Sequence, residues 1–265
     1  MSSDRDKIPI SAVLITKDAE KHLDRVLGPL SVCSEIVVLD SGSRDHTRAI
    51  AERHGAVWHE HPFAGYGPQK RRAVALARHD WILSVDGDEV LDDLGVEALT
   101  ALDWNVEDPA TCWEIRRRPF IGDREIRHGD WAPDRVVRVF NRRYHDFSNV
   151  LVHESVRPTG RVRRLRGSLL HFTSADYAGI FRADNQRLKA EMYRRNGRRA
   201  GQLLLASRAV GVFLRGYLLR RGFLDGTAGL IVALAGAVNS SVGLAMASDE
   251  SSKFTNRVDD SGSRP

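Results

Sequence analysis

Cysteine is scarce in this sequence. Its only two cysteines, Cys33 and Cys112, are too few for a disulfide framework and do not have the spacing of a metal site. A reducing compartment therefore fits the composition. The first residues include acids, and the apolar run after them is too short for a signal peptide, so we expect no export.

Internal repeats and a recognisable nucleic-acid-binding module are also missing. The net charge is nevertheless +5 and the pI about 9.5, and much of the excess is arginine between Arg116 and Arg221. A regional basic charge suits phosphates, whether in a nucleotide or in an anionic membrane. Because no aromatic stacking platform accompanies the arginines, we expect no nucleic-acid partner.

Strand-like and helix-like patterns alternate over the first hundred residues, in a chain of 265 residues that is 42% hydrophobic and can bury one full domain core plus an appendage. Such alternation implies right-handed βαβ units and a mostly parallel, Rossmann-like sheet, with ligands at the carboxyl ends of its strands. Asp18 is expected to cap the first helix. The expected elements are strands at 8–15, 35–39, 56–58 and 81–85, and helices at 19–27, 46–54 and 68–78.

The pattern changes after residue 103. Short strand-like pieces separated by turn residues predict an antiparallel addition to the sheet. Helical, strongly basic sequence follows, then an apolar stretch rich in glycine and alanine, then a polar tail that we expect to be disordered. We therefore divide the chain into a main α/β domain at 1–183, a helical extension at 184–247 and a disordered tail at 248–265.

Three expected strand ends carry polar side chains. They are followed by Thr16-Lys17-Asp18, by Asp40-Ser41-Gly42-Ser43 and by Asp86-Gly87-Asp88-Glu89, and in a parallel sheet they meet at one edge. Two carboxylates on one turn can bind Mg²⁺ or Mn²⁺ and leave positions for diphosphate oxygens. The alternative for an isolated Asp-Gly-Asp is capping of a helix at 90–99, and we expect Glu89 to be an acid at that helix N-terminus.

The sequence resembles the family 2 glycosyltransferases of the GT-A fold. The first hundred residues match that family in order, through ISAVLITKDAEKHL, EIVVLDSGSRDHTRAIA, GYGPQKRRAVALA and DWILSVDGDEVL. Later segments resemble the branch that works on bacterial lipopolysaccharide core, namely GDWAPDRVVRVFNRR, LVHESV, LLHFTS and GFLDGTAGL. The resemblance implies inverting transfer of a sugar from a nucleotide diphosphate sugar, with UDP favoured, to a hydroxyl group.

The resemblance places the nucleotide among the first two strand ends. Thr16, Lys17 and Glu20 would line the pocket for the base and the ribose. Asp40 would accept hydrogen bonds from the base. Its alternative role is to cap the helix after Ser41.

The same resemblance predicts that residues later in the chain bind the diphosphate and a metal ion, Mn²⁺ or Mg²⁺. Lys70 would meet the diphosphate, with Gln69 and Arg71 nearby, although a basic helix N-terminus is usually only a solvated face. Asp86 would contact the ribose or the metal. Asp88 would hold the metal and neutralise the leaving group, and His171 would complete the metal site. A lone histidine after an apolar run is more often structural.

An inverting displacement also needs a carboxylate to take the proton of the acceptor hydroxyl. The resemblance points to Glu154, although this sequence has His-Glu where many members have Glu-Asp. Asp130 and Asp134 are the alternatives. Glu154 could instead pair with one of the arginines around it.

The apolar stretch near the carboxyl end bears on the acceptor. The segment 230–247 has no charge but contains Asn239-Ser240-Ser241, which favours a re-entrant or interfacial hairpin, or a helix packed within the protein. With the basic helix before it, this segment predicts a cytoplasmic protein held peripherally at the inner leaflet, with a glycolipid or glycan acceptor.

Other functions remain open at this stage. Transfer to polyprenyl phosphate or another lipid needs the same membrane-facing site. A nucleotidyltransferase should have a glycine-rich loop after the first strand, and TKDAEK has no glycine. A non-catalytic membrane scaffold would have no reason to bring Asp86, Asp88 and Glu154 together.

Overall fold

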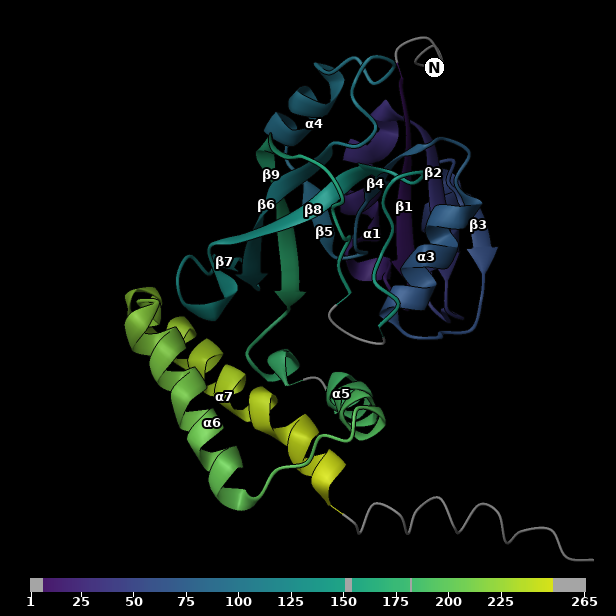
Figure 1. Ribbon diagram of the computed structural model, residues 1–265. Coiled ribbons are helices and arrows are strands. Elements are labelled where there is room, and N and C mark those ends of the chain that lie inside the picture. Colours follow the sequence, from purple (N-terminus) through teal and green to yellow (C-terminus); the bar gives the residue numbers. More distant parts are fainter. Residues whose placement is uncertain (1–6, 151–153, 182, 250–265) are drawn as a thin grey trace, which may run out of the picture. The chain divides into compact units, whose positions relative to one another are not determined.

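The computed structural model describes residues 7–150, 154–181 and 183–249, which form two compact units (Figure 1). The sheet unit runs to Arg127 and continues from Trp131 to Asp176. The helical unit contains the chain from Tyr177 onward together with His128–Asp130. The predicted boundary after residue 183 therefore falls inside the helical unit. Most of the predicted disordered tail, residues 250–265, lies outside the described residues.

The first half of the sheet is parallel, as the alternating pattern predicts. Its strand order is β3-β2-β1-β4, and every neighbouring pair in this part runs parallel. These strands are β1 (Ile8–Thr16), β2 (Cys33–Asp40), β3 (Val57–Glu60) and β4 (Trp81–Ser84), and the helices that alternate with them are α1 (Glu20–Leu27), α2 (Thr47–Arg53) and α3 (Tyr66–Leu76).

The second half of the sheet adds antiparallel strands. Its order continues from β4 through β8, β6 and β9 to β5, with β7 paired to β6. The β6–β9 pair is parallel and the other pairs in this half are antiparallel. The strands are β5 (Glu89–Leu91), β6 (Cys112–Ile121), β7 (Arg124–Glu125), β8 (Asp134–Asn141) and β9 (Val162–Ser174). The predicted fold class, a parallel α/β sheet with an antiparallel addition, is confirmed.

Apolar side chains cover both faces of the sheet, which is why β1 is apolar almost throughout. One cluster includes Leu23 and Leu27 of α1, and the other includes Ala73 and Val74 of α3. Parallel pairing in register sets Thr16 opposite Asp40, so the loops after β1 and β2 start at the same edge.

The acids after β4 are arranged differently from the prediction. Glu89 does not begin a helix but is the first residue of β5, and it is fully buried. The helix begins later, as α4 (Asp93–Thr100), and the side chain of Asp92 caps it by accepting from the amide of Gly95 at 2.9 Å. The expected helix at 90–99 therefore starts too early, because a strand of three residues separates the acids from it.

The start of α1 also differs from the prediction. Asp18 has a φ of 47°, and its carboxylate accepts from the amide of Arg44 instead of capping the helix. The amides of Ala19 and Glu20 donate instead to Thr47 and Asp45, at 2.8 and 3.1 Å. The start of the first helix is thus held by Asp45 of the loop after β2 and by Thr47, the first residue of α2.

The helical unit consists mainly of α5 (Ala183–Arg195), α6 (Gln202–Leu214) and α7 (Gly226–Ser248), and α6 lies beside α7 (Figure 1). A π-helical turn, Arg215–Leu219, extends α6. Among the described residues, the segments Gln202–Leu219 and Gly222–Ser248 are long and apolar enough to cross a membrane, by length and composition alone. Short 3₁₀ turns complete the described elements: η2 (Pro29–Val32), η3 (Gly129–Trp131), η4 (Ala178–Ile180) and η6 (Gly222–Asp225).

The polar interruption in the apolar stretch does not break the helix. Asn239 accepts a hydrogen bond from Gln186 of α5 at 2.9 Å, and the hydroxyl of Ser241 donates to the carbonyl of Leu205 in α6 at 3.1 Å. Residues 230–247 therefore form one continuous helix with polar contacts to α5 and α6, and this helix is partly exposed.

Candidate active site

The loops after β1 and β2 form one connected structure at the edge of the sheet. The hydroxyl of Thr16 donates to Asp40 at 2.8 Å, and Lys17 donates to the carbonyl of Gly42. Glu20 accepts from both the amide and the imidazole Nδ1 of His46, at 3.0 and 2.8 Å. The hydrogen bonds from the His46 amide and ring lower the pKa of Glu20. Four of the residues predicted to bind the nucleotide thus join the two loops.

Asp40 is 1% exposed, and donors of its own chain meet both of its carboxylate oxygens. One oxygen accepts from the hydroxyls of Thr16 and Ser43, at 2.8 and 2.6 Å. The other accepts from the amides of Gly42 and Ser43, at 2.8 and 2.6 Å. Asp40 therefore fixes the shape of the loop, and it can accept a bond from a nucleotide base only if one of these donors is replaced.

Gln69 and Lys70 lie on the first turns of α3 and are both buried. The amide nitrogen of Gln69 donates to Ser41 and to the carbonyl of His61, each at 3.1 Å. Its amide oxygen has no partner among the described residues. Gln69 thus connects α3 to the loop after β2, with one acceptor still available.

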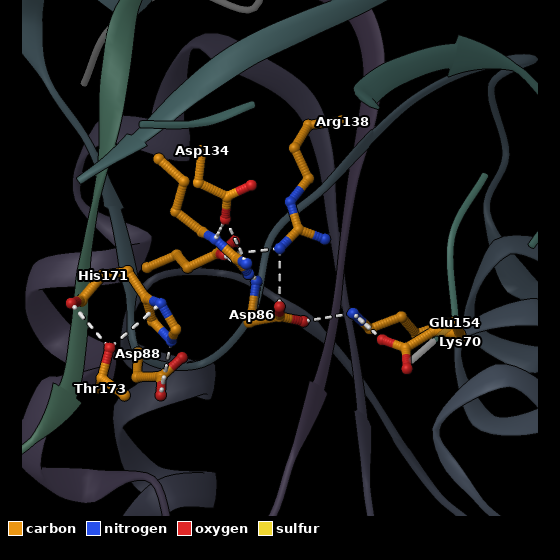
Figure 2. Close-up of polar contacts among 10 residues, drawn as sticks. Lys70, Asp86, Asp88, Asp134, Arg138, Glu154, His171 and Thr173 are labelled. Atoms are coloured by element: carbon orange, nitrogen blue, oxygen red, sulfur yellow. Dashed lines mark hydrogen bonds and ion pairs between the residues drawn. The ribbon is translucent and has the colours of Figure 1, made fainter. Parts of the chain in front are cut away.

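Lys70 joins two carboxylates that lie far apart in the sequence. Its ammonium nitrogen is 2.7 Å from an oxygen of Asp86 and 2.7 Å from an oxygen of Glu154, as Figure 2 shows. Burial alone would lower the pKa of Lys70, but the charges of Asp86 and Glu154 outweigh burial and raise it. At neutral pH, Lys70 is therefore a buried cation between the residue predicted to contact the donor and the residue predicted to act as base.

Arg138 of β8 holds the other side of Asp86. Its guanidinium contacts Asp86 at 2.7 Å (Figure 2). It also lies 2.5 Å from Glu89, and the amide of Asp86 donates to Glu89 at 3.2 Å. Burial alone would raise the pKa of the Asp86 carboxyl, but the charges of Arg138 and Lys70 hold it well below its usual range. Asp86 thus remains ionised, with a cation on each oxygen.

The network extends to Asp134 through Arg117, which contacts Asp134 at 2.8 Å and Glu89 at 3.5 Å. These ion pairs form one network around Asp86, and Asp88 lies next to it in the sequence. Together they contain more carboxylates than lysine and arginine side chains. The carboxylates belong to Asp86, Asp88, Glu89, Asp134 and Glu154, and the cations to Lys70, Arg117 and Arg138. The surplus of negative charge is of the kind that a divalent cation offsets.

Asp88 and His171 form a pair of their own. The carboxylate of Asp88 lies 3.5 Å from Nε2 of His171, and the hydroxyl of Thr173 lies 3.3 Å from Nδ1 (Figure 2). The pairing of β5 with β9 sets Glu89 opposite His171 and so brings Asp88 next to it. Burial alone would lower the pKa of His171, but the hydrogen bond and charge of Asp88 and the charge of Glu89 raise it.

The residues at this position suit a metal ion that arrives with a diphosphate. No group of three or more His, Cys, Asp or Glu side chains lies close enough to hold a metal by itself, within the part of the chain that the structure describes. Mg²⁺ and Mn²⁺ in nucleotide sites usually take one or two protein ligands and the oxygens of the substrate phosphates. Asp88 and His171 fit that requirement, whereas both oxygens of Asp86 are already paired with cations.

Asp130, one of the alternatives for the base, belongs to the helical unit. Its carboxylate accepts two hydrogen bonds from Arg215, at 3.1 and 3.0 Å, and lies 3.5 Å from Arg220. A carboxylate held in this way is committed to a structural ion pair. Of the other two candidates for the base, Asp134 pairs with Arg117, and Glu154 contacts Lys70.

A family model for glycosyl transferase family 2 matches residues 11–188 of this chain. The chain belongs to glycosyl transferase family 2. The matched residues include Thr16, Asp40, Lys70, Asp86, Asp88, Glu154 and His171.

Several characterised and uncharacterised glycosyltransferases are similar to this one. The lipopolysaccharide core biosynthesis glycosyltransferase LpsC of Rhizobium meliloti (strain 1021) is 33% identical over 248 residues, which cover 88% of this chain and 89% of LpsC. The uncharacterized glycosyltransferase RP128 of Rickettsia prowazekii (strain Madrid E) is 26% identical over 94% of this chain and 90% of its own. The glucosyl-3-phosphoglycerate synthase of Mycobacterium tuberculosis matches 44% of this chain and 45% of its own, at 23% identity and a TM-score of 0.33, too little to support an argument.

The sequence did not identify three residues of this glycosyltransferase's site. Arg138 and Arg117 approach the acids from β8 and β6, and Glu89 pairs with both of them. The signal available in the sequence was the arginine within the apolar run Val136-Val137-Arg138-Val139-Phe140. A charge at the centre of a buried strand needs a partner, and the nearest candidates are acids at other strand ends.

Proposed function

We propose that this glycosyltransferase moves a hexose from a UDP-hexose to a hydroxyl of a membrane-linked glycan such as lipopolysaccharide core, with inversion at the anomeric carbon. The observation that carries the proposal is Lys70 between Asp86 and Glu154, 2.7 Å from each, because it joins a donor-side and an acceptor-side carboxylate. The acceptor class is supported by the similarity to LpsC, a lipopolysaccharide core biosynthesis glycosyltransferase.

The donor binds, in this proposal, at the joined loops after β1 and β2. Thr16, Lys17, Glu20 and Asp40 line the pocket for the base and ribose. The buried Gln69 has a free acceptor at its amide oxygen, which suits an N–H or O–H group of the donor.

The diphosphate lies, in this proposal, against Lys70, Asp88 and His171. Asp88 and His171 would hold Mn²⁺ or Mg²⁺, which would neutralise the charge on the leaving diphosphate. The ammonium of Lys70 can exchange its contact with Asp86 for one with a diphosphate oxygen. Arg138 keeps Asp86 in place when that happens, because it contacts the other oxygen of this carboxylate.

Glu154 acts as the base. One of its oxygens contacts Lys70, so the other can accept the proton of the acceptor hydroxyl. As the proton moves to Glu154, the hydroxyl oxygen forms its bond to the anomeric carbon, and the bond from that carbon to the diphosphate oxygen breaks on the opposite side. The attack and the departure lie on opposite faces of the sugar, which inverts the anomeric carbon.

With a membrane-linked acceptor, we place the enzyme in the cytoplasm, peripherally bound to the inner face of the cytoplasmic membrane. Both a nucleotide sugar and a lipid-linked glycan are accessible there. Polyprenyl phosphate is the second candidate acceptor. The same membrane-facing position would serve it.

The test is sugar transfer by the full-length chain. Radiolabelled UDP-hexoses are incubated with Mn²⁺ and with either core-truncated lipopolysaccharide or polyprenyl phosphate, and label in the lipid fraction is counted. We expect transfer to the lipopolysaccharide, and a loss of about 10²–10⁴-fold in Glu154→Gln, because general-base catalysis contributes about that factor. Glu97→Gln, an acid on α4, is the matched control and keeps full activity. Transfer to neither acceptor, or full activity of Glu154→Gln, would overturn the proposal.

A further inference from the structure

Polar groups join the helices of the helical unit, and most of its leucines in the described residues are exposed. Asn239 and Ser241 form hydrogen bonds with α5 and α6, and Arg208 of α6 donates to the carbonyl of Ser240 at 2.9 Å. The other inward positions of α7 are mostly alanine, glycine and valine. A water-soluble helical bundle has the opposite arrangement, with its large apolar residues in the core.

Large apolar residues of α6 and the turn after it form one exposed surface, the α6 face. No residue of α6 is buried, and only 6% of the segment Gln202–Leu219 is buried despite a mean hydropathy of 1.2. Leu203 is 85% exposed. The α6 face consists of Leu203, Leu204, Val210, Leu214 and Leu218. A continuous apolar surface of this kind marks a site of contact with a protein or a membrane.

Arginines border the α6 face. Arg208 and Arg215 lie seven residues apart, which places them on one side of the helix, along the edge of the α6 face. Further arginines lie at the two ends of the helical segment, as Arg198 and Arg199 before it and Arg220 and Arg221 after it. Arg208 and Arg215 contact the Ser240 carbonyl and Asp130, but both side chains are exposed. Long basic side chains beside apolar ones can exchange such contacts for phosphate groups while the leucines enter lipid.

One end of this helical pair is held by a segment from the middle of the chain. His128 contacts Asp225 through its amide and its Nδ1, at 2.8 and 2.9 Å. The amide of Gly129 donates to the carbonyl of Arg220 at 2.9 Å, and Asp130 pairs with Arg215. The residues on either side of this segment belong to the sheet unit. The polar groups of the turn at Arg220–Asp225 are therefore engaged within the helical unit.

From these observations we infer that the α6 face lies flat on an anionic phospholipid surface, with its leucines below the headgroups and the flanking arginines at the level of the phosphates. The inference rests on the proposed function only in the choice of a lipid surface over a second copy of the chain. Apolar content alone would also suit a protein partner, but the arginines along the edge and at both ends complement an anionic leaflet. Arg208 lies in the middle of α6, where a span would place its charge in the hydrocarbon core, and this argues against a span.

The first test is sedimentation of the full-length protein with phosphatidylcholine vesicles, with and without phosphatidylglycerol. We expect binding to the anionic vesicles, weakened by added salt, and a reduction of about tenfold or more when Leu203→Glu and Val210→Glu are combined. Val106→Glu, a change at a 78% exposed residue of the sheet unit, is the matched control and binds as the wild type does. Far-UV circular dichroism and titration with UDP and Mn²⁺ show whether each variant is folded.

The second test measures depth with nitroxide labels at Leu203→Cys and Leu214→Cys. The native Cys33 and Cys112 are buried, and burial raises their thiol pKa values to about 12 and about 11, so labelling is selective for the introduced thiol. The two labels lie about 16 Å apart along an ideal helix. A helix lying flat places both at the same shallow depth, whereas a span or a dip places them at depths that differ by most of that distance.

Three results would overturn the inference: no binding to anionic vesicles, equal binding by the double variant and the wild type, or unequal label depths. If a second copy covers the α6 face, the protein sediments as a dimer that the double variant disrupts, and vesicle binding is absent. The residues proposed to bind UDP and Mn²⁺ all lie in the sheet unit, so titration with UDP and Mn²⁺ tests that unit alone. Its outcome therefore separates a failure of this inference from a failure of the proposed function.

Discussion

The guanidinium of Arg138 lies between the carboxylates of Asp86 and Glu89, and the residue is only 5% exposed. Removing one member of a buried charge network leaves the other charges without compensation, at a cost of about 3–5 kcal/mol. We expect Arg138→Met to lower the free energy of unfolding by about that amount in denaturant titrations. Arg135→Met, on the same strand but with a more exposed side chain, should change it by less than about 1 kcal/mol. Equal effects of the two changes would show that Arg138 has no special role.

The same network makes stability depend on pH. The folded-state pKa of Asp86 is held below its ordinary value of 3.8 by Arg138 and Lys70, although burial opposes this. A lowered pKa stabilises the folded state above the unfolded-state value, and this contribution disappears as the pH falls toward the folded-state value. The difference in unfolding free energy between the wild type and Asp86→Asn should therefore be constant from neutral pH to about 5 and should shrink below about 4. A difference that grows on acidification would contradict this account of Asp86.

The residues of the site were predictable to different degrees. Asp86, Asp88 and Glu154 follow from strand ends and from the family resemblance, and the structure brings Asp86 and Glu154 together through Lys70. Which cation meets Asp86 depends on the pairing of β4 with β8, across some fifty residues of sequence that no local pattern records. Roles for these residues in binding and catalysis remain predictions.

At the scale of elements, the main error in the first half of the chain was the predicted start of the helix at 90–99, which begins at Asp93. Acids directly after a strand match the pattern of a helix N-terminus, but residues 89–91 pair with β9 before α4 begins. That strand needs a partner from residues 169–171, so its existence depends on a contact that is distant in sequence. The polar residues of α7 were interpreted as an interruption for the same reason, because their partners lie on α5 and α6.

The correct cap gives a prediction for α4. Asp92 accepts from the amide of Gly95 and from the amide of Ser168 in β9, each at 2.9 Å. Asp92→Ala leaves both amides without this acceptor and should cost about 1–2 kcal/mol of unfolding free energy, as the loss of a helix cap does. Asp93→Ala, at the next position, should cost only a few tenths of a kcal/mol. If Asp93→Ala proves the more costly change in thermal unfolding, the cap is assigned to the wrong residue.

At the scale of the whole molecule, the alternating pattern predicted the fold class, and the change of pattern predicted a helical extension after residue 183. The helical unit begins at Tyr177 and takes in His128–Asp130, and a segment of three residues has no signature of its own in the sequence. Asp130 illustrates the consequence, since its place near the family motif made it a candidate base, while the structure commits it to arginines of the helical unit. The regional basic charge was visible in the sequence, and so were the two apolar helical segments.

The central claim is that Asp88 holds a divalent ion against the diphosphate of a nucleotide sugar. The most direct test is calorimetric titration of the protein with UDP, GDP and their sugar conjugates, with and without Mn²⁺, for wild type, Asp88→Ala and the control Asp93→Ala. The account predicts binding of UDP compounds that depends on Mn²⁺, persists in Asp93→Ala and is lost in Asp88→Ala. Binding of no nucleotide under either condition, or undiminished binding by Asp88→Ala, would contradict it.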